Sequence, residues 1–92
     1  MEFEWDEKKS QENEKKHGLS FRDAERVFDG ETATYLDDRK DYREERYITM
    51  GELEGRLVVI VHAVRGEVIR IISMRRGNER EKKTYRQRLG KD

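Results

Sequence analysis

Two adjacent arginines, Arg75 and Arg76, end a predicted strand that begins at Val68. Guanidinium groups form forked hydrogen bonds to phosphate, and a helix predicted to begin after Asn78 would place free backbone N–H groups beside them. The pair therefore predicts a phosphate-binding site where a strand meets a helix. The alternative is structural, because the two arginines could instead pair with acids such as Glu79.

The segment Lys16-His17-Gly18 is a second candidate site. Histidine exchanges protons near neutral pH, and lysine can hold a phosphate or stabilise its charge in a transition state. The alternative is an ordinary helix end, because cations favour the C-terminal turn of any helix. Taken alone, the segment is better interpreted as such a helix end.

Other polar residues fit structural roles. His62 lies within an apolar run, so it is predicted to be a hydrogen-bonded core residue and not a catalyst. Tyr85 is predicted to pack on the last helix, with its hydroxyl able to reach a groove. A run of basic residues on that helix predicts a solvated face: Arg80, Lys82, Lys83, Arg86 and Arg88.

Several classes of protein are excluded by what the sequence lacks. The spacing of histidines and carboxylates predicts no metal site, and neither a phosphate-binding glycine motif nor a nucleophile elbow occurs. We therefore expect no metal or other cofactor. The absence of cysteine fits a reducing compartment. No apolar run approaches the roughly 20 residues that span a bilayer, and the acidic first residues do not resemble a secretion signal. These features predict a cytoplasmic protein without a membrane partner.

The net charge of zero conceals an asymmetry between the two halves of the chain. Residues 1–46 hold 10 Lys or Arg against 15 Asp or Glu, whereas residues 47–92 hold 11 against 6. Arginine supplies 8 of those 11 basic residues. A basic C-terminal half can face a nucleic acid although the whole chain is neutral. A solvated, charge-rich surface is the alternative explanation.

The 92 residues predict one domain, residues 1–92, with a modest core and an α+β fold of order β-α-α-β-β-β-β-α. Glu54-Gly55 and Gly66-Glu67 fit hairpin turns, so we expect one antiparallel sheet with the apolar segment 57–64 inside it. Strict alternation in segment 68–75 places Arg70 with Met74 on one face and Arg75 with Ile71 on the other. The predicted helices cover 6–17, a segment that begins after Ser20, and a segment that begins after Asn78; the predicted strands cover 3–5, 32–36, 46–53, 57–64 and 68–75.

A set of motifs in this order resembles the BrnT family of toxins over about residues 3–86. The resemblance implies a RelE-like ribonuclease fold with two helices before the sheet and one after it. It also implies RNA cleavage that halts translation without a bound metal, and neutralisation by a BrnA-type antitoxin. The matching residues are Phe3 to Lys8, Asn13, Lys16 to Phe21, Ala24 to Asp29, Glu45 to Ile48, Gly51, Arg70 to Arg75, Arg80-Glu81 and Tyr85.

The acidic N-terminal half predicts that the free toxin does not hold DNA by itself. We therefore expect the antitoxin to provide the DNA-reading element, so that the toxin–antitoxin complex binds operator DNA, and a homodimer within that complex is allowed. Departures from the family pattern include Gly77-Asn78, where alanine and threonine are more usual, and His62, where an aromatic residue is usual. The first departure borders the expected site and could weaken activity. The implied catalytic residues are Lys16, His17, Arg75 and Arg76, and the implied substrate-binding residues are Arg65, Arg70, Arg80 and Tyr85.

Cleavage of RNA without metal needs three chemical roles. One group takes the proton of the ribose 2′-hydroxyl, one stabilises the charged phosphorane, and one protonates the leaving 5′-oxygen. Arginine and lysine suit the second role, and His17 could serve in either proton transfer. The rival hypothesis is a binding module that uses the basic half of the chain to dock a protein or nucleic acid without cleaving it.

Overall fold

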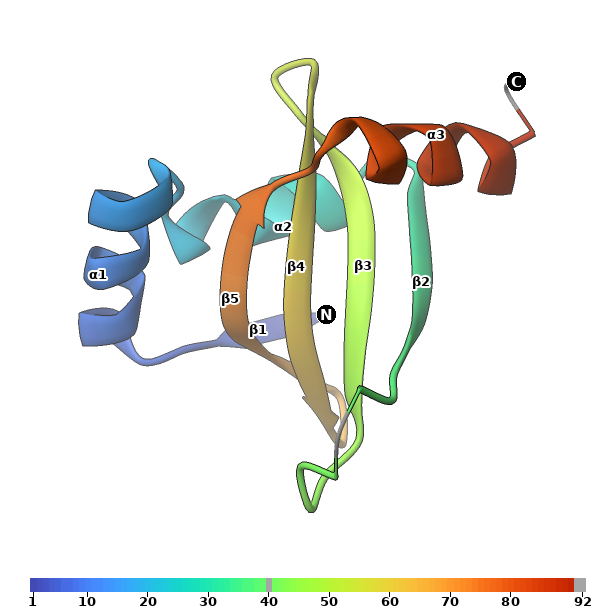
Figure 1. Cartoon of the computed structure of the whole chain (residues 1–92). Helices are drawn as coiled ribbons and strands as arrows, with labels where there is room; N and C mark the ends of the chain where they lie inside the picture. The colour runs from blue at the N-terminus through green and yellow to red at the C-terminus, as the bar shows by residue number, and fades with distance from the viewer. Residues whose placement is uncertain (40, 91–92) are drawn as a thin grey trace.

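Helices lie on both faces of a five-stranded sheet in the computed structural model, which describes residues 1–39 and 41–90 (Figure 1). The order of elements confirms the α+β prediction, although the second helix divides into a short 3-10 turn, η1, and α2. The elements are β1 (Glu2–Glu4), α1 (Glu7–His17), η1 (Phe21–Asp23), α2 (Ala24–Phe28), β2 (Thr32–Asp37), β3 (Arg46–Leu53), β4 (Arg56–Arg65), β5 (Val68–Arg76) and α3 (Glu79–Arg88).

The sheet has the strand order β1-β5-β4-β3-β2, so the apolar strand β4 is interior, as predicted. Strands β2 to β5 pair in antiparallel fashion, but β1 lies parallel to β5, with Glu2 opposite Val68. The prediction of a purely antiparallel sheet is therefore wrong for this edge strand. A long connection, here most of the chain, is what permits two strands to pair in parallel.

A β-bulge in β5 overturns the predicted division of its side chains between the two faces. Val61 lies opposite Ser73 and His62 opposite Ile71, so Ile72 has no partner in β4. Such an extra residue shifts the alternation of every side chain that follows it. Ile71 and Met74 consequently share one core cluster, which strict alternation had separated.

The same shift moves Arg75 to the α3 side of the sheet. Arg75 pairs with Val59, which belongs to the core cluster on that side. The prediction that Arg75 shares a face with Ile71 is wrong, because the bulge lies between them. Arg70 precedes the bulge and does not share a face with Met74.

Local capping signals set the helix ends. Asp6 accepts a hydrogen bond from the Lys9 N–H at 3.1 Å, and Gly18, with φ of 73°, caps the C-terminal end of α1. Ser20 caps η1. Asn78 and Glu81 form a reciprocal capping box at the start of α3, as their spacing predicted.

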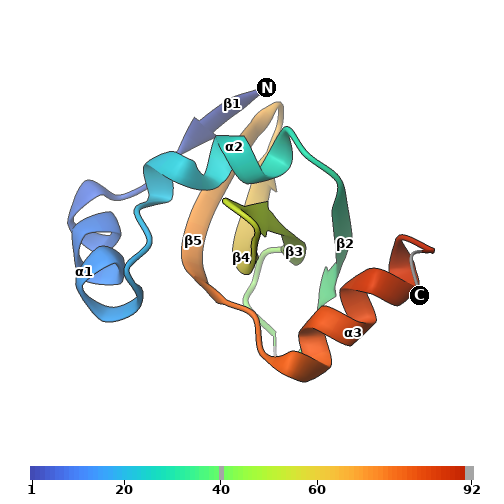
Figure 2. The same cartoon turned by 90° about the horizontal axis from the view of Figure 1, so that it is seen from above.

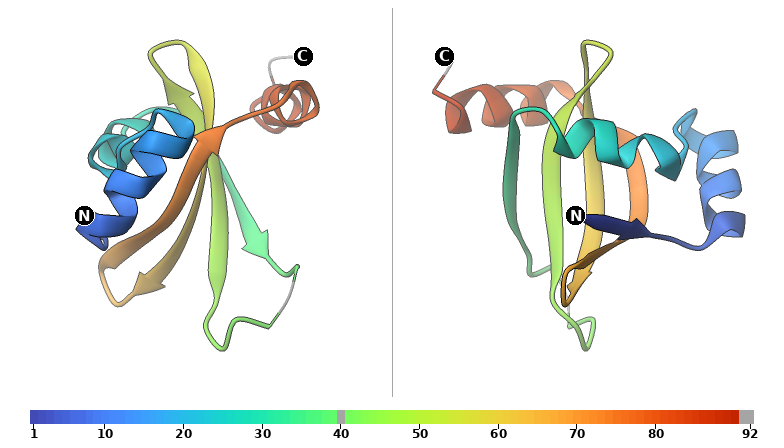
Figure 3. Two further views of the ribbon diagram at one scale, coloured as in Figure 1. Left: turned by 60° about the vertical axis from the view of Figure 1, so that its left-hand side comes forward. Right: turned by 180° about the vertical axis from the view of Figure 1, so that it is seen from behind.

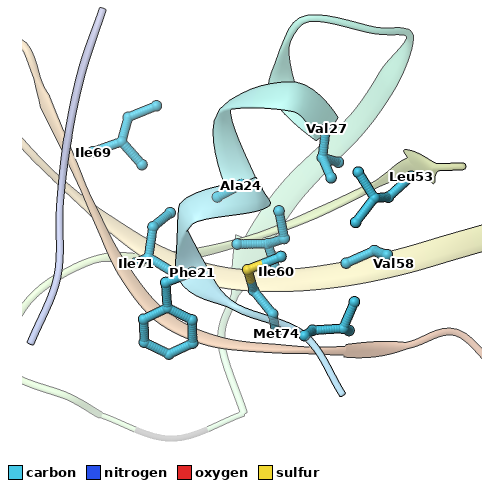
Figure 4. Close-up of a cluster of buried hydrophobic side chains, with 10 residues drawn as sticks. Phe21, Ala24, Val27, Leu53, Val58, Ile60, Ile69, Ile71 and Met74 are labelled. Carbon is cyan, nitrogen blue, oxygen red and sulfur yellow. The ribbon is translucent and has the colours of Figure 1, made fainter. Parts of the chain in front are cut away.

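Two hydrophobic clusters hold the layers together. Helices α1 and α2 lie on one side of the sheet and α3 on the other, as the turned views show (Figures 2 and 3). On the first side, Phe21, Ala24 and Val27 pack against the sheet (Figure 4). On the second, Tyr85 of α3 and Leu89, which follows α3, pack against Met50 and Val59. The α3 side is therefore anchored by few side chains.

Helix α1 docks through polar side chains because it has almost no apolar face. Asn13 donates from Nδ2 to the Leu19 carbonyl at 2.9 Å and accepts at Oδ1 from the Met74 N–H at 3.3 Å. Ser10 Oγ accepts from the Phe21 N–H at 3.0 Å. Buried hydrogen bonds thus join α1 to β5 and η1.

Within residues 1–39 and 41–90, no helix has the length and hydropathy to cross a membrane.

Candidate phosphate-binding groove

A groove of about 520 Å³ is lined by residues of α3 and of the β3–β4 hairpin. These two elements lie at the end of the sheet where β5 leads into α3 (Figure 1). The volume of the groove is within the range of ligand-binding pockets. We call it the basic groove, because four cations line it together with one carboxylate, two glycines and the side chains of Leu57 and Tyr85. The charged lining residues are Arg56, Arg76, Lys82, Arg86 and Glu52.

The arginines of the basic groove have uncompensated charge. Within the described part of the chain, Arg56, Arg76 and Arg86 form no ion pair, whereas the other cation, Lys82, contacts Glu79 at 3.1 Å. Positive charges that converge on a cavity without acidic partners raise the local concentration of anions. Arginine also offers the forked geometry that matches phosphate oxygens. The basic groove can therefore hold a phosphate group.

Arg75, predicted as a catalytic residue, is engaged in a structural ion pair. Its guanidinium group donates to both carboxylate oxygens of Glu81 in α3, at 2.9 and 2.7 Å. The Arg75 guanidinium lowers the pKa of Glu81, and the hydrogen bond to Glu81 raises the pKa of Arg75. Arg75 thus has an acidic partner, as the structural alternative predicted, but that partner is Glu81 and not Glu79; the catalytic role of Arg75 stays a prediction. Arg76 is exposed and lines the basic groove.

Lys16 and His17 lie at the C-terminal end of α1, beside a second hollow. Lys16 is exposed and His17 half-buried, and neither lines the basic groove. The second hollow, of about 370 Å³, is lined by Gly18 and Leu19 and shares Arg56 and Arg76 with the basic groove. The structure therefore brings the end of α1 toward Arg76, while Arg56 and Arg76 border both hollows.

Asn13 connects the two predicted sites. Its buried side chain bridges the Leu19 carbonyl and the Met74 N–H, so it ties the loop after α1 to the end of β5. A side chain with both amide groups bonded fixes the distance between the segments that it joins. Asn13 thereby positions the Lys16-His17 segment relative to Arg75 and Arg76.

The other predicted substrate-binding residues do not join the basic groove, except for Tyr85. Arg70 contacts Glu4 at 2.6 Å, and Arg65 contacts Glu4 and Glu44 at 3.9 and 3.5 Å. These pairs lie at the opposite end of the sheet, near the β4–β5 turn (Figure 1). Arg80 is exposed on α3 and is absent from the groove lining.

Tyr85 is a buried lining residue of the basic groove. Its hydroxyl donates to the Glu31 carbonyl at 2.8 Å, so the hydroxyl fastens α3 to the segment before β2. The predicted packing role is confirmed. The ring forms part of the groove wall.

His62 is a buried core residue, as predicted, and lines neither the basic groove nor the second hollow. Its ring Nε2 shares a hydrogen bond of 2.8 Å with the Thr49 hydroxyl, and the rings of Phe28 and Tyr47 pack against it. Burial lowers the pKa of His62 to about 4, because the apolar surroundings disfavour the charged form. At neutral pH this histidine is therefore uncharged.

Gly77 and Asn78, which follow the arginine pair, have local structural functions. The Gly77 N–H donates to the Leu57 carbonyl at 2.9 Å, and a Cβ at position 77 would lie 2.4 Å from Leu57 Cδ2. This close approach favours glycine unless the Leu57 side chain moves. Asn78 caps α3. Both residues thus shape the start of the helix that borders the basic groove.

The sequence did not predict four of the residues that line the basic groove as site residues: Arg56, Glu52, Lys82 and Arg86. Lys82 and Arg86 were interpreted as a solvated helix face, although their four-residue spacing places them on one side of α3. Arg56 and Glu52 flank the predicted Glu54-Gly55 turn. The only available signal was that this hairpin had to lie at the same end of the sheet as Arg76.

In residues 1–39 and 41–90, no three His, Cys, Asp or Glu side chains are close enough together to hold a metal ion.

The mixed sheet, flanking helices and basic groove define a small α+β protein suited to binding a polyanion. The chain matches, over residues 5–81, the family described as ribonuclease toxin, BrnT, of type II toxin-antitoxin system. The protein therefore belongs to the BrnT family, and the predicted resemblance is confirmed. It is a ribonuclease toxin, whose family implies an RNA target and an antitoxin partner. No curated protein matches the chain.

Proposed function

We propose that this chain is a metal-independent endoribonuclease that binds the RNA backbone in the basic groove and cleaves it by attack of the ribose 2′-hydroxyl. The observation that carries the proposal is the convergence on one cavity of three arginines, Arg56, Arg76 and Arg86, that form no ion pair with any residue the structure describes. Positive charge placed in advance around a phosphate stabilises the phosphorane, whose negative charge increases in the transition state. No bound cation is required for that stabilisation.

In this proposal some candidate residues contact the RNA, and another supports the site without contacting it. Arg76 contacts the phosphate directly, because it is exposed and borders both hollows. Lys16 and His17 contact RNA that continues into the second hollow, where His17 can protonate the leaving oxygen. Arg75 supports the site through its ion pair with Glu81 and does not itself contact the phosphate.

A chelation experiment tests metal independence. Purified protein is incubated with a fluorescent RNA in a metal-free buffer with EDTA, and cleavage is followed by gel electrophoresis. We expect an unchanged rate and products that end in a 2′,3′-cyclic phosphate. Loss of cleavage in EDTA, with recovery on addition of magnesium, would contradict the proposal.

A second candidate function is phosphate binding without cleavage, which one observation favours. No histidine lines the basic groove. A groove that offers four cations and one carboxylate, Glu52, but no histidine would bind RNA and not cleave it if the proton transfers require a histidine. Binding of RNA with a salt-dependent affinity but no cleavage, at any pH between 5 and 9, would favour this candidate.

We further propose that the antitoxin is of the BrnA type and covers the basic groove, and that RNA cleavage in the cytoplasm halts translation. The support is electrostatic, because an acidic segment laid over Arg76 and α3 would compete with phosphate for the same charges. Operator DNA would bind only to the toxin–antitoxin complex, in which two toxin chains could meet as a homodimer. Co-purification with the product of the adjacent gene, a cleavage assay and a promoter gel-shift test these points. A neighbour that binds without reducing cleavage would contradict them.

A further inference from the structure

We infer that Glu52 is the general base of the reaction, taking the proton from the attacking 2′-hydroxyl; this inference rests on the proposed ribonuclease function. No residue of the basic groove was assigned to proton transfer by the sequence. Glu52 is the carboxylate among the groove's charged lining residues.

The position of Glu52 in the sheet directs it to the groove. It pairs with Leu57 of β4, and its neighbour but one, Met50, packs in the cluster under α3 together with Leu57. Alternation along β3 therefore places Glu52 on the α3 side of the sheet. A residue in the ladder of two paired strands has a backbone held in place, as a catalytic base requires.

Glu52 also differs from the other carboxylates at this end of the sheet. In the described chain it has no ion pair, whereas both oxygens of Glu81 accept from Arg75. Glu79 contacts Lys82, and Glu54 contacts Arg26 at 3.7 Å and lines the second hollow instead. Among these acids, Glu52 alone combines access to the basic groove with unpaired oxygens.

The four groove cations put the substrate within reach of this carboxylate. A phosphate held by Arg56 and Arg76 lies in the same cavity as Glu52, with Lys82 and Arg86 on the facing helix. The 2′-hydroxyl of the nucleotide on the 5′ side of that phosphate is adjacent to the phosphorus that it attacks. The buried His62 is hydrogen-bonded in the core and cannot substitute for Glu52.

The reaction balances with the groups that are present. The Glu52 carboxylate takes the proton of the 2′-hydroxyl as the 2′-oxygen forms its bond to phosphorus. The bond from phosphorus to the 5′-oxygen then breaks, and that oxygen takes a proton from His17 or water. The products are a 2′,3′-cyclic phosphate and a 5′-hydroxyl, and nothing is oxidised or reduced. A well-placed general base contributes about 10² to 10⁴ in rate.

Substitution Glu52→Gln tests the inference, because glutamine keeps the size of the side chain but does not accept the proton. We expect a kcat for RNA cleavage reduced by about 100-fold or more, with RNA affinity equal to or tighter than that of the unmodified protein. The acid limb of the pH–rate profile should also disappear. Glu52→Asp should retain an intermediate rate, since it keeps the carboxylate but shortens it.

The matched control is Glu67→Gln, an exposed glutamate in the β4–β5 turn at the opposite end of the sheet. It removes the same charge and should leave kcat and the pH profile unchanged. If the unmodified protein cleaves RNA and folded Glu52→Gln keeps its kcat and acid limb, the inference is overturned and the ribonuclease proposal stands. If the unmodified protein does not cleave RNA at all, both fail.

Discussion

Arginines lie at both ends of the sheet, but their surroundings differ. At the β4–β5 turn, Arg65 and Arg70 contact Glu4, and Arg65 also contacts Glu44. At the end where β5 leads into α3, Arg56 and Arg76 form no ion pair in the described chain and border the basic groove. Arginine side chains thus hold the edge strand β1 through ion pairs at one end of the sheet, and at the other end their charge is available to a ligand.

The difference shows that uncompensated charge identifies a candidate site better than the number of arginines does. A paired guanidinium must give up its carboxylate before it can bind phosphate, and the two processes then compete. An unpaired guanidinium meets no such competition, although several of them together repel one another. Proteins retain such repulsion mainly where function requires it.

The substitution Arg76→Ala should give the largest effect and tests this comparison directly. We expect RNA cleavage to fall by about 100-fold or more, because one preorganised group that stabilises transition-state charge contributes on that scale. The matched control is Arg70→Ala, which removes an arginine from the same strand but from the paired end. If Arg70→Ala reduces cleavage as strongly while both variants remain folded, the comparison between the two ends is wrong.

Acidification should lower the free energy of unfolding, because it affects His62 in the sheet between the two ends. The pKa of His62 is lowered to about 4 in the folded protein, against 6.5 in the unfolded chain. Between these values the unfolded chain takes up a proton that the folded protein does not, so the free energy of unfolding decreases as the pH falls from 6.5 to 4. The loss should reach about 3 kcal/mol.

Denaturant unfolding at a series of pH values measures this loss. The control is His62→Gln, which keeps a hydrogen-bonding side chain beside Thr49 but does not titrate. Its stability should depend less on pH in this interval. Equal slopes for the two proteins would show that His62 does not carry the effect.

The substitution Arg75→Ala should give the smallest effect, since it breaks one partly exposed ion pair. The side chains of Arg75 and Glu81 are 43% and 19% exposed, so solvent screens their attraction. We expect a loss of about 1 kcal/mol and a melting temperature lower by roughly 4–8 °C. Glu81→Gln should give a similar loss.

Cleavage by Arg75→Ala, assayed well below its melting temperature, should fall less than that of Arg76→Ala. This expectation replaces the equal roles that the sequence predicted for the two arginines. A severe loss of cleavage in Arg75→Ala with an unchanged melting temperature would instead show that Arg75 contacts the substrate.

The sequence by itself determined the features that depend on neighbouring residues. The Asp6 and Asn78 caps, the two hairpin turns and the interior strand β4 each follow from a few adjacent side chains, because capping, turn geometry and apolar runs are local. The resemblance of the motifs to the BrnT family was also contained in the sequence, and the match over residues 5–81 confirms it.

The tertiary structure alone decided which charges are paired and which are available. The bulge at Ile72 places Arg75 on the α3 side of the sheet, where it contacts Glu81. The β3–β4 hairpin returns to the α3 end of the sheet, so Glu52 and Arg56 line the same groove as Arg76. These arrangements join residues that are distant in the chain, and a one-residue shift in strand pairing changes the face of every side chain after it. No pattern of neighbouring residues encodes such a shift, so the composition of the basic groove follows from the fold.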